Sequence, residues 1–260
     1  LIVEFREHPS LGFALMNAKL HLGEKWKYYI ITIFESAPFI QRVISSVFPN
    51  NVLSLDPEDN NKKLSRYSYT ISSTFNIELW TWRNSSMSMN TDLYSMLFKR
   101  QDFWDIFLLH HGVMIYQVDS VFVRDPAYSI EHFIDYDYVG APWCKDNDIL
   151  MPLLAAGTIK YLVGNGGFSW RTIKSMNDCV REMAAESPLS EPEDRFFIRC
   201  FSAFYGEYNV ASVEVARTFS VEVPCWEFDA EIKQGKRPLG LHAVWYYAKE
   251  SIIRSTLQLS

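Results

Sequence analysis

The chain has 260 residues, of which 48% are hydrophobic and 15% aromatic, which is enough apolar material for a sizeable buried core. Its formal net charge of −6 argues against nucleic acid as a partner, because phosphate binding needs a dominant basic surface. No stretch reaches the roughly 18 apolar residues of a membrane-spanning helix, so we expect no membrane span within this chain. It starts at Leu1 without a signal-peptide pattern, and we expect it to be part of a longer protein.

The N-terminal part of the chain alternates β-rich runs with amphipathic runs. Strands are predicted at residues 1–6 and 26–34, helices at 10–22 and 38–47, and further β-rich segments within 50–61 and at 69–82. This rhythm predicts an α/β fold whose parallel strands are joined by right-handed crossovers. Glu4 and Arg6 end the first strand, where a nucleotide base or ribose could be contacted, although a surface ion pair explains them equally well.

A helix is predicted at residues 89–107, and its apolar stripe at Leu93, Met96 and Leu97 is typical of core packing. The apolar run after it, residues 112–118, ends at Asp119 without a glycine or proline break. Since ligands of open α/β sheets bind beyond the carboxyl ends of the strands, Asp119 is a candidate ligand-binding residue. A turn residue or helix cap is the alternative.

Strand 138–143 runs into a glycine and proline break at Trp143, a residue that could stack on a sugar ring or close the core. Residues 145–158 look like a loop. At 163–171, Asn165, Gly166 and Gly167 form a glycine-rich turn whose backbone could approach a ligand closely. The spacing of a dinucleotide fingerprint and the lysine of a P-loop are both absent from this turn.

Helices are predicted at 172–185 and 195–204, with late strands at 219–223 and 239–245. Glu193 and Asp194 begin the second helix, where carboxylates either cap the helix or serve as a general base. His242 follows a glycine and is either a core imidazole or a metal ligand.

The four cysteines form no C-x-x-C pair, so isolated buried thiols are expected, although two disulfides could also form. Asn84-Ser85-Ser86 has the form of a glycosylation sequon.

Several motifs occur together in one order. They are Gln117-x-Asp119-Ser120, Asp137 to Trp143 (DYVGAPW), Gly164 to Ser169 (GNGGFS), Pro192-Glu193-Asp194 and Gly240-x-His242. In this combination the chain resembles a family of proposed glycosyltransferases, catalogued as a domain of unknown function and related to the GT-A superfamily.

The resemblance implies one GT-A-like domain over residues 1–260, with a Rossmann-like, mainly parallel central sheet and helices on both faces. About 1–125 would form the nucleotide-sugar donor half and about 126–260 the acceptor half. The residues implied in donor binding are Glu4, Arg6, Gln117, Val118, Asp119, Asn165, Gly166 and Gly167. Acceptor or sugar contacts are implied for Trp143, Phe168 and Glu193, a metal site (Mn²⁺ or Mg²⁺) for Asp119 and His242, and the role of general base for Asp194.

Gln117 stands where a full D-x-D motif has its first Asp, so diphosphate oxygens and water would complete the cation's shell. Arg6 or Lys249 could instead supply positive charge. The expected function is transfer of a sugar, with inversion, from a UDP-sugar to a hydroxyl of a glycan or other acceptor. The alternative is a catalytically inactive sugar- or nucleotide-binding domain, whereas a pyrophosphorylase would need a basic glycine-rich N-terminal signature that residues 1–25 lack.

Overall fold

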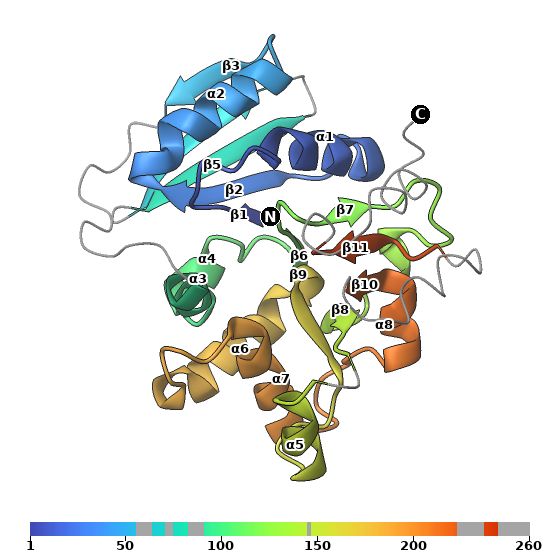
Figure 1. The fold of residues 1–260 in the computed structure, drawn as a ribbon. Helices are drawn as coiled ribbons and strands as arrows, with labels where there is room; N and C mark the ends of the chain where they lie inside the picture. Colours follow the sequence, from blue (N-terminus) through green and yellow to red (C-terminus); the bar gives the residue numbers. More distant parts are fainter. Residues whose placement is uncertain (56–63, 71–74, 83–90, 145–146, 223–236, 244–260) are drawn as a thin grey trace. The chain divides into compact units, whose positions relative to one another are not determined.

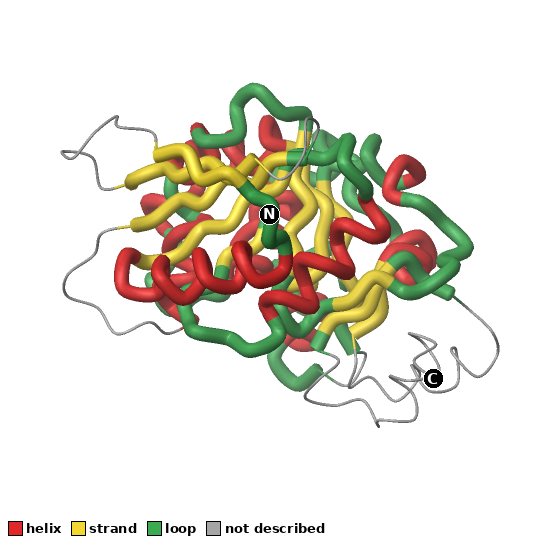
Figure 2. The backbone as a smooth tube through the Cα atoms, turned by 90° about the horizontal axis from the view of Figure 1, so that it is seen from above, coloured by secondary structure: helices red, strands yellow, loops and turns green. Residues whose placement is uncertain are grey.

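The structure is a computed structural model that describes residues 1–55, 64–70, 75–82, 91–144, 147–222 and 237–243 (Figure 1). Its residues divide into two compact units, Leu1–Met89 with Tyr116–Val118, and Asn90–Ile115 with Asp119–Ser260. We call these unit 1 and unit 2. Both contain strands and helices, which Figure 2 distinguishes by colour along the backbone.

Unit 1 holds a five-stranded sheet in the order β1-β2-β5-β4-β3. Its elements are β1 (Ile2–Val3), α1 (Leu11–Leu22), β2 (Tyr28–Ile33), α2 (Ala37–Val47), β3 (Val52–Leu55), β4 (Leu64–Thr70) and β5 (Asn76–Trp82). The parallel pairing predicted from the strand–helix rhythm is confirmed for β1, β2 and β5. Residues 56–63 and 71–75 are connections too short for a crossover, so β3, β4 and β5 pair antiparallel.

Unit 2 holds two three-stranded sheets, β10-β11-β7 and β6-β9-β8. Its helices are α3 (Thr91–Phe98), α4 (Gln101–Asp105), α5 (Leu150–Ala155), α6 (Ile173–Met183), α7 (Glu193–Ala203) and α8 (Val213–Phe219). Its strands are β6 (Gly112–Tyr116), β7 (Val121–Phe122), β8 (Tyr138–Pro142), β9 (Val163–Thr172), β10 (Ser220–Glu222) and β11 (Gly240–His242).

The protein is therefore mixed α/β, but the expected single, mainly parallel sheet does not appear among the described residues. Strands β8 and β9 pair antiparallel, as do β7 and β11, and each of the three sheets has its own edges. The sequence pattern identifies a strand but not its neighbour, which explains why a parallel arrangement was predicted too widely.

Two other segments differ from expectation. The helix predicted at 89–107 is divided into α3 and α4, and the indole N–H of Trp104 donates to the Phe98 carbonyl at the end of α3. The predicted loop at 145–158 contains α5, whose first turn tolerates Pro152 because amides there have no intrahelical partner. Asn147 Oδ1 accepts hydrogen bonds from the amides of Ile149 and Leu150 at the start of that helix.

The core of unit 2 confirms the packing predicted for the stripe at Leu93 and Leu97, both of which are buried. The core of unit 2 also contains a group of edge-to-face rings contributed by Phe98, Phe103, Trp104, Phe107 and Phe197. No helix within the described ranges combines the length and apolar content needed to cross a bilayer.

Candidate functional site

The glycine-rich segment predicted as a turn is part of β9, a strand buried along its whole length. It pairs antiparallel with β8, with register shifts around Ala141. A Cβ on Gly140 would lie 2.4 Å from the Asn165 carbonyl oxygen, so glycine is required for the two strands to approach this closely. The glycines of the two motifs thus serve strand packing.

Gly164 and Gly166 make room for neighbouring side chains. Gly164 has φ +155°, and a Cβ there would lie 2.6 Å from the Trp143 ring. A Cβ on Gly166 would lie 2.1 Å from Glu193 Oε1 and 2.7 Å from Arg171 Nη2. Both substitutions would collide with buried groups.

Arg171 of β9 and Glu193 of α7 form a buried bidentate ion pair. Nη1 donates to Oε2 at 2.6 Å and Nη2 to Oε1 at 3.0 Å, and Nε donates to Ser169 Oγ. The guanidinium carbon also lies 5.1 Å from the ring centroids of Phe98 and Tyr138. Both Glu193 oxygens are occupied, so contact with an acceptor would require this pair to open.

The other two residues implied in acceptor binding are in the core. Phe168 is fully buried against Phe122 and Phe219, and its ring lies where a side chain on Gly240 would be. Trp143 is 9% exposed and packs at Gly164, which supports the core interpretation of this residue over sugar stacking.

Polar residues from four separate segments meet at one end of β11. His242 Nε2 lies 3.6 Å from Asp119 Oδ1, and Nδ1 lies 3.6 Å from Glu222 Oε1. Asn165 Nδ2 donates to Glu222 Oε2, and Asn165 Oδ1 accepts from the Gly167 amide. We call Asp119, Asn165, Glu222 and His242 the carboxylate–histidine cluster, together with Asp194, whose negative charge also acts on the His242 imidazole.

Strand pairing explains the convergence. Glu222 and His242 are register partners on the parallel strands β10 and β11. Strand β7, which follows Asp119 and Ser120 in the chain, pairs with β11 on the other side. Ser120 Oγ donates to the Gly167 carbonyl, which ties the start of β7 to β9.

His242 is 9% exposed and its charge is controlled by its carboxylate neighbours. Burial alone would lower the pKa of the imidazole, but Glu222 and Asp119 outweigh that effect and raise the pKa above its usual value. The negative charge of Asp194 acts in the same direction.

Asp194 is half-buried in the first turn of α7, where its Oδ1 accepts from the Arg195 amide. Loss of hydration raises the pKa of this carboxyl to about 7, and the charges of Glu193 and Glu222 add to the rise. A carboxyl with a pKa near 7 can exchange a proton at neutral pH, which an ordinary surface Asp cannot.

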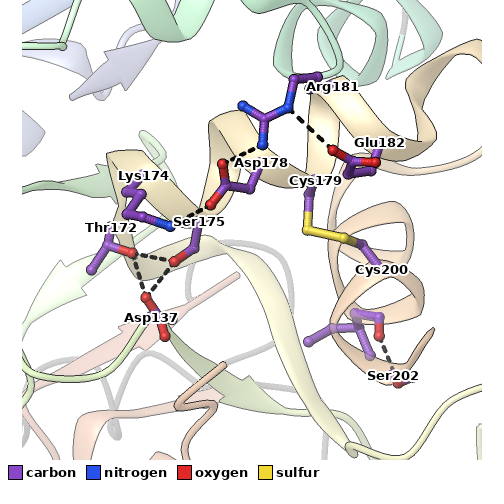
Figure 3. Close-up of a disulfide and its surroundings, with 11 residues drawn as sticks. Asp137, Thr172, Lys174, Ser175, Asp178, Cys179, Arg181, Glu182, Cys200 and Ser202 are labelled. Carbon is purple, nitrogen blue, oxygen red and sulfur yellow. Dashed lines mark hydrogen bonds and ion pairs between the residues drawn. A yellow bond between two sulfur atoms is a disulfide. The ribbon is translucent and has the colours of Figure 1, made fainter. Parts of the chain in front are cut away.

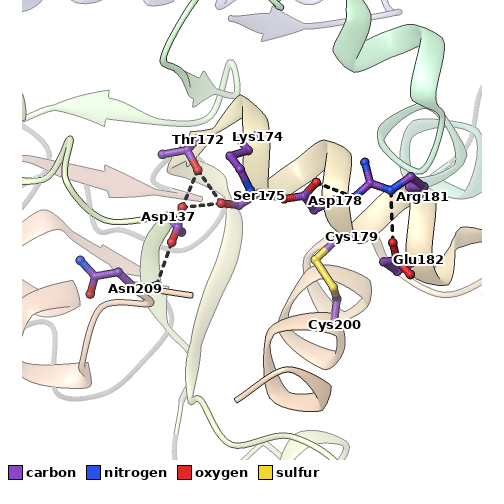
Figure 4. Close-up of polar contacts among 10 residues, drawn as sticks. All are labelled: Asp137, Thr172, Lys174, Ser175, Asp178, Cys179, Arg181, Glu182, Cys200 and Asn209. Carbon is purple, nitrogen blue, oxygen red and sulfur yellow. Dashed lines mark hydrogen bonds and ion pairs between the residues drawn. A yellow bond between two sulfur atoms is a disulfide. The ribbon is translucent and has the colours of Figure 1, made fainter. Parts of the chain in front are cut away.

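The position of α7 is fixed by α6 and its neighbours. Cys179 and Cys200 form a disulfide between the two helices (Figure 3). At the start of α6, Asp137 accepts hydrogen bonds from Thr172 Oγ1 and Ser175 Oγ, and its other oxygen accepts from the Asn209 amide (Figure 4). The disulfide ties α7, which carries Asp194, to α6. The hydrogen bonds to Asp137 in turn hold the start of α6.

The expectation of isolated buried thiols is wrong for Cys179 and Cys200, and Cys144 is disulfide-bonded as well. Sequence spacing gave no basis for pairing them, because the two cysteines of the described disulfide are 21 residues apart on different helices.

Asp119 and His242 could supply at most part of the ligand set of a divalent cation. Within the described residues no group of three or more His, Cys, Asp or Glu side chains is arranged to hold a metal. Asp119 and His242 nevertheless face each other, and in the described part of the chain no lysine or arginine forms an ion pair with Asp119, Asp194 or Glu222. Such a donor set fits a cation shared with phosphate oxygens better than an all-protein cage.

Four donor-binding candidates belong to unit 1. Glu4 is buried and forms a bidentate ion pair with Arg6, in which Nε donates to Oε1 at 2.9 Å and Nη2 to Oε2 at 3.0 Å. Of the two interpretations of these residues, a nucleotide contact or an ion pair, the structure shows the ion pair. Gln117 and Val118 immediately precede Asp119 in the chain, and Val118 is buried. Lys249 and the sequon at Asn84 lie outside the described residues.

Sequence reasoning missed Arg171 and Glu222. Glu222 is the lone carboxylate that ends the short β-rich run Ser220-Val221, the same signal that identified Asp119. Arg171 lies two residues after the glycine-rich motif, but its partner lies 22 residues downstream, and only the fold reveals that the pair is buried.

The fold and the cluster describe a mixed α/β protein with a half-buried carboxylate–histidine site. Residues 78–242 match the model of a family described as a protein of unknown function, DUF5672. Because the match covers more than half of the chain, the chain belongs to this family. It includes the whole carboxylate–histidine cluster and excludes Glu4 and Arg6. A comparison with curated proteins found no match.

Proposed function

We propose that the protein is a glycosyltransferase of GT-A type that transfers a sugar, with inversion, from a nucleotide sugar to a hydroxyl of a glycan or other acceptor. The observation that carries the proposal is the cluster itself. A raised-pKa carboxylate, an Asp–His pair and a glycine-rich strand come together from segments that span residues 119–242. A UDP-sugar is the donor to test first.

In the proposed reaction, Asp194 takes the proton of the acceptor hydroxyl. The hydroxyl oxygen attacks the anomeric carbon, and the bond to the diphosphate breaks, so that the nucleoside diphosphate leaves with the electron pair. The pKa of about 7 suits this step, since the carboxylate is available at neutral pH and still basic enough to accept a proton. Asn165 would keep Glu222 in place beside His242 rather than contact a sugar, since its amide is already hydrogen-bonded.

The negative charge of the cluster favours a bound cation. A nucleotide sugar carries a diphosphate, which three nearby carboxylates would repel. Mn²⁺ or Mg²⁺ held by Asp119 and His242 would offset the charge of the diphosphate as it leaves. The absence of a carboxylate at Gln117 leaves this pair of ligands without the first Asp of a D-x-D motif.

The test is to incubate the protein with a panel of UDP- and GDP-sugars, with Mn²⁺ or with a chelator, and to measure both binding and release of free nucleoside diphosphate. We expect release with at least one donor in Mn²⁺. Binding without any release would instead support the inactive sugar- or nucleotide-binding domain, which the replacement at Gln117 favours. If the protein neither binds any of the donors nor releases nucleoside diphosphate from them, both the transferase and the inactive binding domain are contradicted.

A further inference from the structure

The imidazole of His242 lies between two carboxylates, and each ring nitrogen faces a different one. Nε2 faces Asp119 at 3.6 Å, and Nδ1 faces Glu222 at 3.6 Å. The two sides are not equivalent. Asp119 precedes strand β7, whereas Glu222 is fixed by strand pairing with His242 itself and by the hydrogen bond from Asn165.

A histidine that binds a metal through one ring nitrogen generally donates its other N–H to a carboxylate or carbonyl, which sets the tautomer and the ring orientation. Glu222 is in the position of that second partner. With the proton on Nδ1 directed to Glu222, the lone pair of Nε2 is directed to the side of Asp119, where a cation could be held by both.

We infer that Glu222 is a positioning residue for a divalent cation. It holds the His242 proton on Nδ1, so that Nε2 and Asp119 together present a nitrogen and an oxygen to Mn²⁺ or Mg²⁺. Asn165 supports this by donating to the second Glu222 oxygen. The inference deepens the proposed function. It rests on that function in one respect, since the cation's other ligand would be a nucleoside diphosphate.

The carboxylate of Glu222 is needed in this arrangement because it has two acceptor oxygens. One accepts from Asn165 and the other faces His242. Glutamine has nearly the same size but a single acceptor oxygen, so Glu222→Gln cannot accept from both neighbours. The variant therefore changes the hydrogen bonding of His242 without leaving a cavity.

The experiment measures Mn²⁺ binding directly, by titration calorimetry and by the electron paramagnetic resonance signal of free Mn²⁺, alone and with UDP. We expect Glu222→Gln to weaken Mn²⁺ binding by about 10- to 100-fold. His242→Ala should abolish it. Glu207→Gln, an exposed Glu of unit 2, serves as the matched control and should bind Mn²⁺ as the wild type does.

A role in folding alone would give a different pattern. If Glu222 only tied β10 to β11, Glu222→Gln would lower the metal-free melting temperature and leave the Mn²⁺ affinity of the folded protein unchanged, which would overturn the inference. Should the variant fail to fold, the wild type still provides a test. Nitrogen NMR of His242, recorded at a pH high enough for the imidazole to be neutral, is expected to show the proton on Nδ1 and a response of Nε2 to Mg²⁺. A neutral ring with its proton on Nε2 would overturn the inference.

Failure of the inference can be told apart from failure of the proposed function. If the wild type releases UDP from a UDP-sugar in the presence of chelator and binds no Mn²⁺, the positioning role of Glu222 is wrong while the transferase stands. If Mn²⁺ binds and depends on Glu222 but no nucleotide or nucleotide sugar binds, the positioning role stands and the transferase is wrong.

Discussion

At the scale of single residues, Asp194 shows how the fold sets a proton affinity. Its carboxyl loses hydration at the start of α7 and lies near Glu193 and Glu222, so its pKa rises to about 7. Glu193 itself is compensated by Arg171, whereas Asp194 has the Arg195 amide at its Oδ1. A carboxyl that keeps its proton toward neutral pH affects stability as well as chemistry.

The pH dependence of stability follows from that pKa. Between about pH 4 and pH 7 the folded protein holds a proton on Asp194 that the unfolded chain releases, because an exposed Asp titrates near 4. This contribution to stability is fully present below about pH 4 and is lost as the pH rises through about 7. Asp194→Asn removes the ionisation, and we expect the variant to melt several degrees above the wild type at pH 8.

Metal-free thermal unfolding at pH 4.5 and pH 8 measures this effect. The difference between Asp194→Asn and wild type should shrink at pH 4.5, where the wild-type carboxyl is largely protonated. Asp148→Asn, at an exposed position of unit 2, is the control and should show no such dependence. An equal difference at both pH values would contradict the raised pKa.

Gly166 is predicted to be intolerant of any side chain. A Cβ would lie 2.1 Å from Glu193 Oε1, so Gly166→Ala would push apart the Arg171–Glu193 pair. Disrupting a buried ion pair costs about 3–5 kcal/mol. Gly12→Ala in α1 is a useful comparison, since its Cβ would meet only side-chain methyl groups, of Val47 at 3.2 Å and of Val43 at 3.6 Å.

Chemical denaturation of the two glycine variants measures the difference. We expect Gly166→Ala to unfold at much lower denaturant and Gly12→Ala to change little. A Gly166→Ala protein as stable as the wild type would mean that the ion pair does not need glycine beside it.

At the scale of elements, much of the chain could be predicted from the sequence. The alternation of β-rich and amphipathic runs located β2, α1, α2, α6 and α7, because buried faces impose a periodicity that the sequence displays. Strand β9 was predicted as a turn because glycines usually mark turns. Its glycines instead allow close packing with β8, Trp143 and Glu193, partners that no local pattern identifies.

The disulfide between α6 and α7 is an element-scale feature with a measurable effect. It closes a loop over a sequence separation of 21 residues, and a loop of this size contributes about 3 kcal/mol by restricting the unfolded chain. We expect the double variant Cys179→Ala/Cys200→Ala to be destabilised by about that amount. Denaturation curves of the oxidised proteins give the comparison.

Adding reductant distinguishes the effect of losing the disulfide from the effect of losing the packing of the two cysteine side chains. Reductant should destabilise the wild type more than the double variant, because the variant has already lost the Cys179–Cys200 bridge while Cys144 is disulfide-bonded in both. Equal effects of reductant on the two proteins would argue that this bridge contributes little to stability.

At the scale of the whole molecule, the family match and the cluster coincide. The matched segment, residues 78–242, contains the elements that carry Asp119, Asn165, Asp194, Glu222 and His242. The sequence motifs indicated four of these five, and Glu222 was missed because its partners come from strands distant in the chain. The pairing of β10 with β11 identifies Glu222 as a member of the cluster, which the spacing of the motifs does not.

The most direct measurement of the central claim compares nucleoside diphosphate release from a nucleotide sugar by wild type and by Asp194→Asn, with Mn²⁺ and acceptor, between pH 5 and pH 9. The account predicts that the wild-type rate rises with pH through about 7 as Asp194 loses its proton, and that Asp194→Asn is slower by about 10²- to 10⁴-fold. A variant that releases nucleoside diphosphate at the wild-type rate would contradict the account.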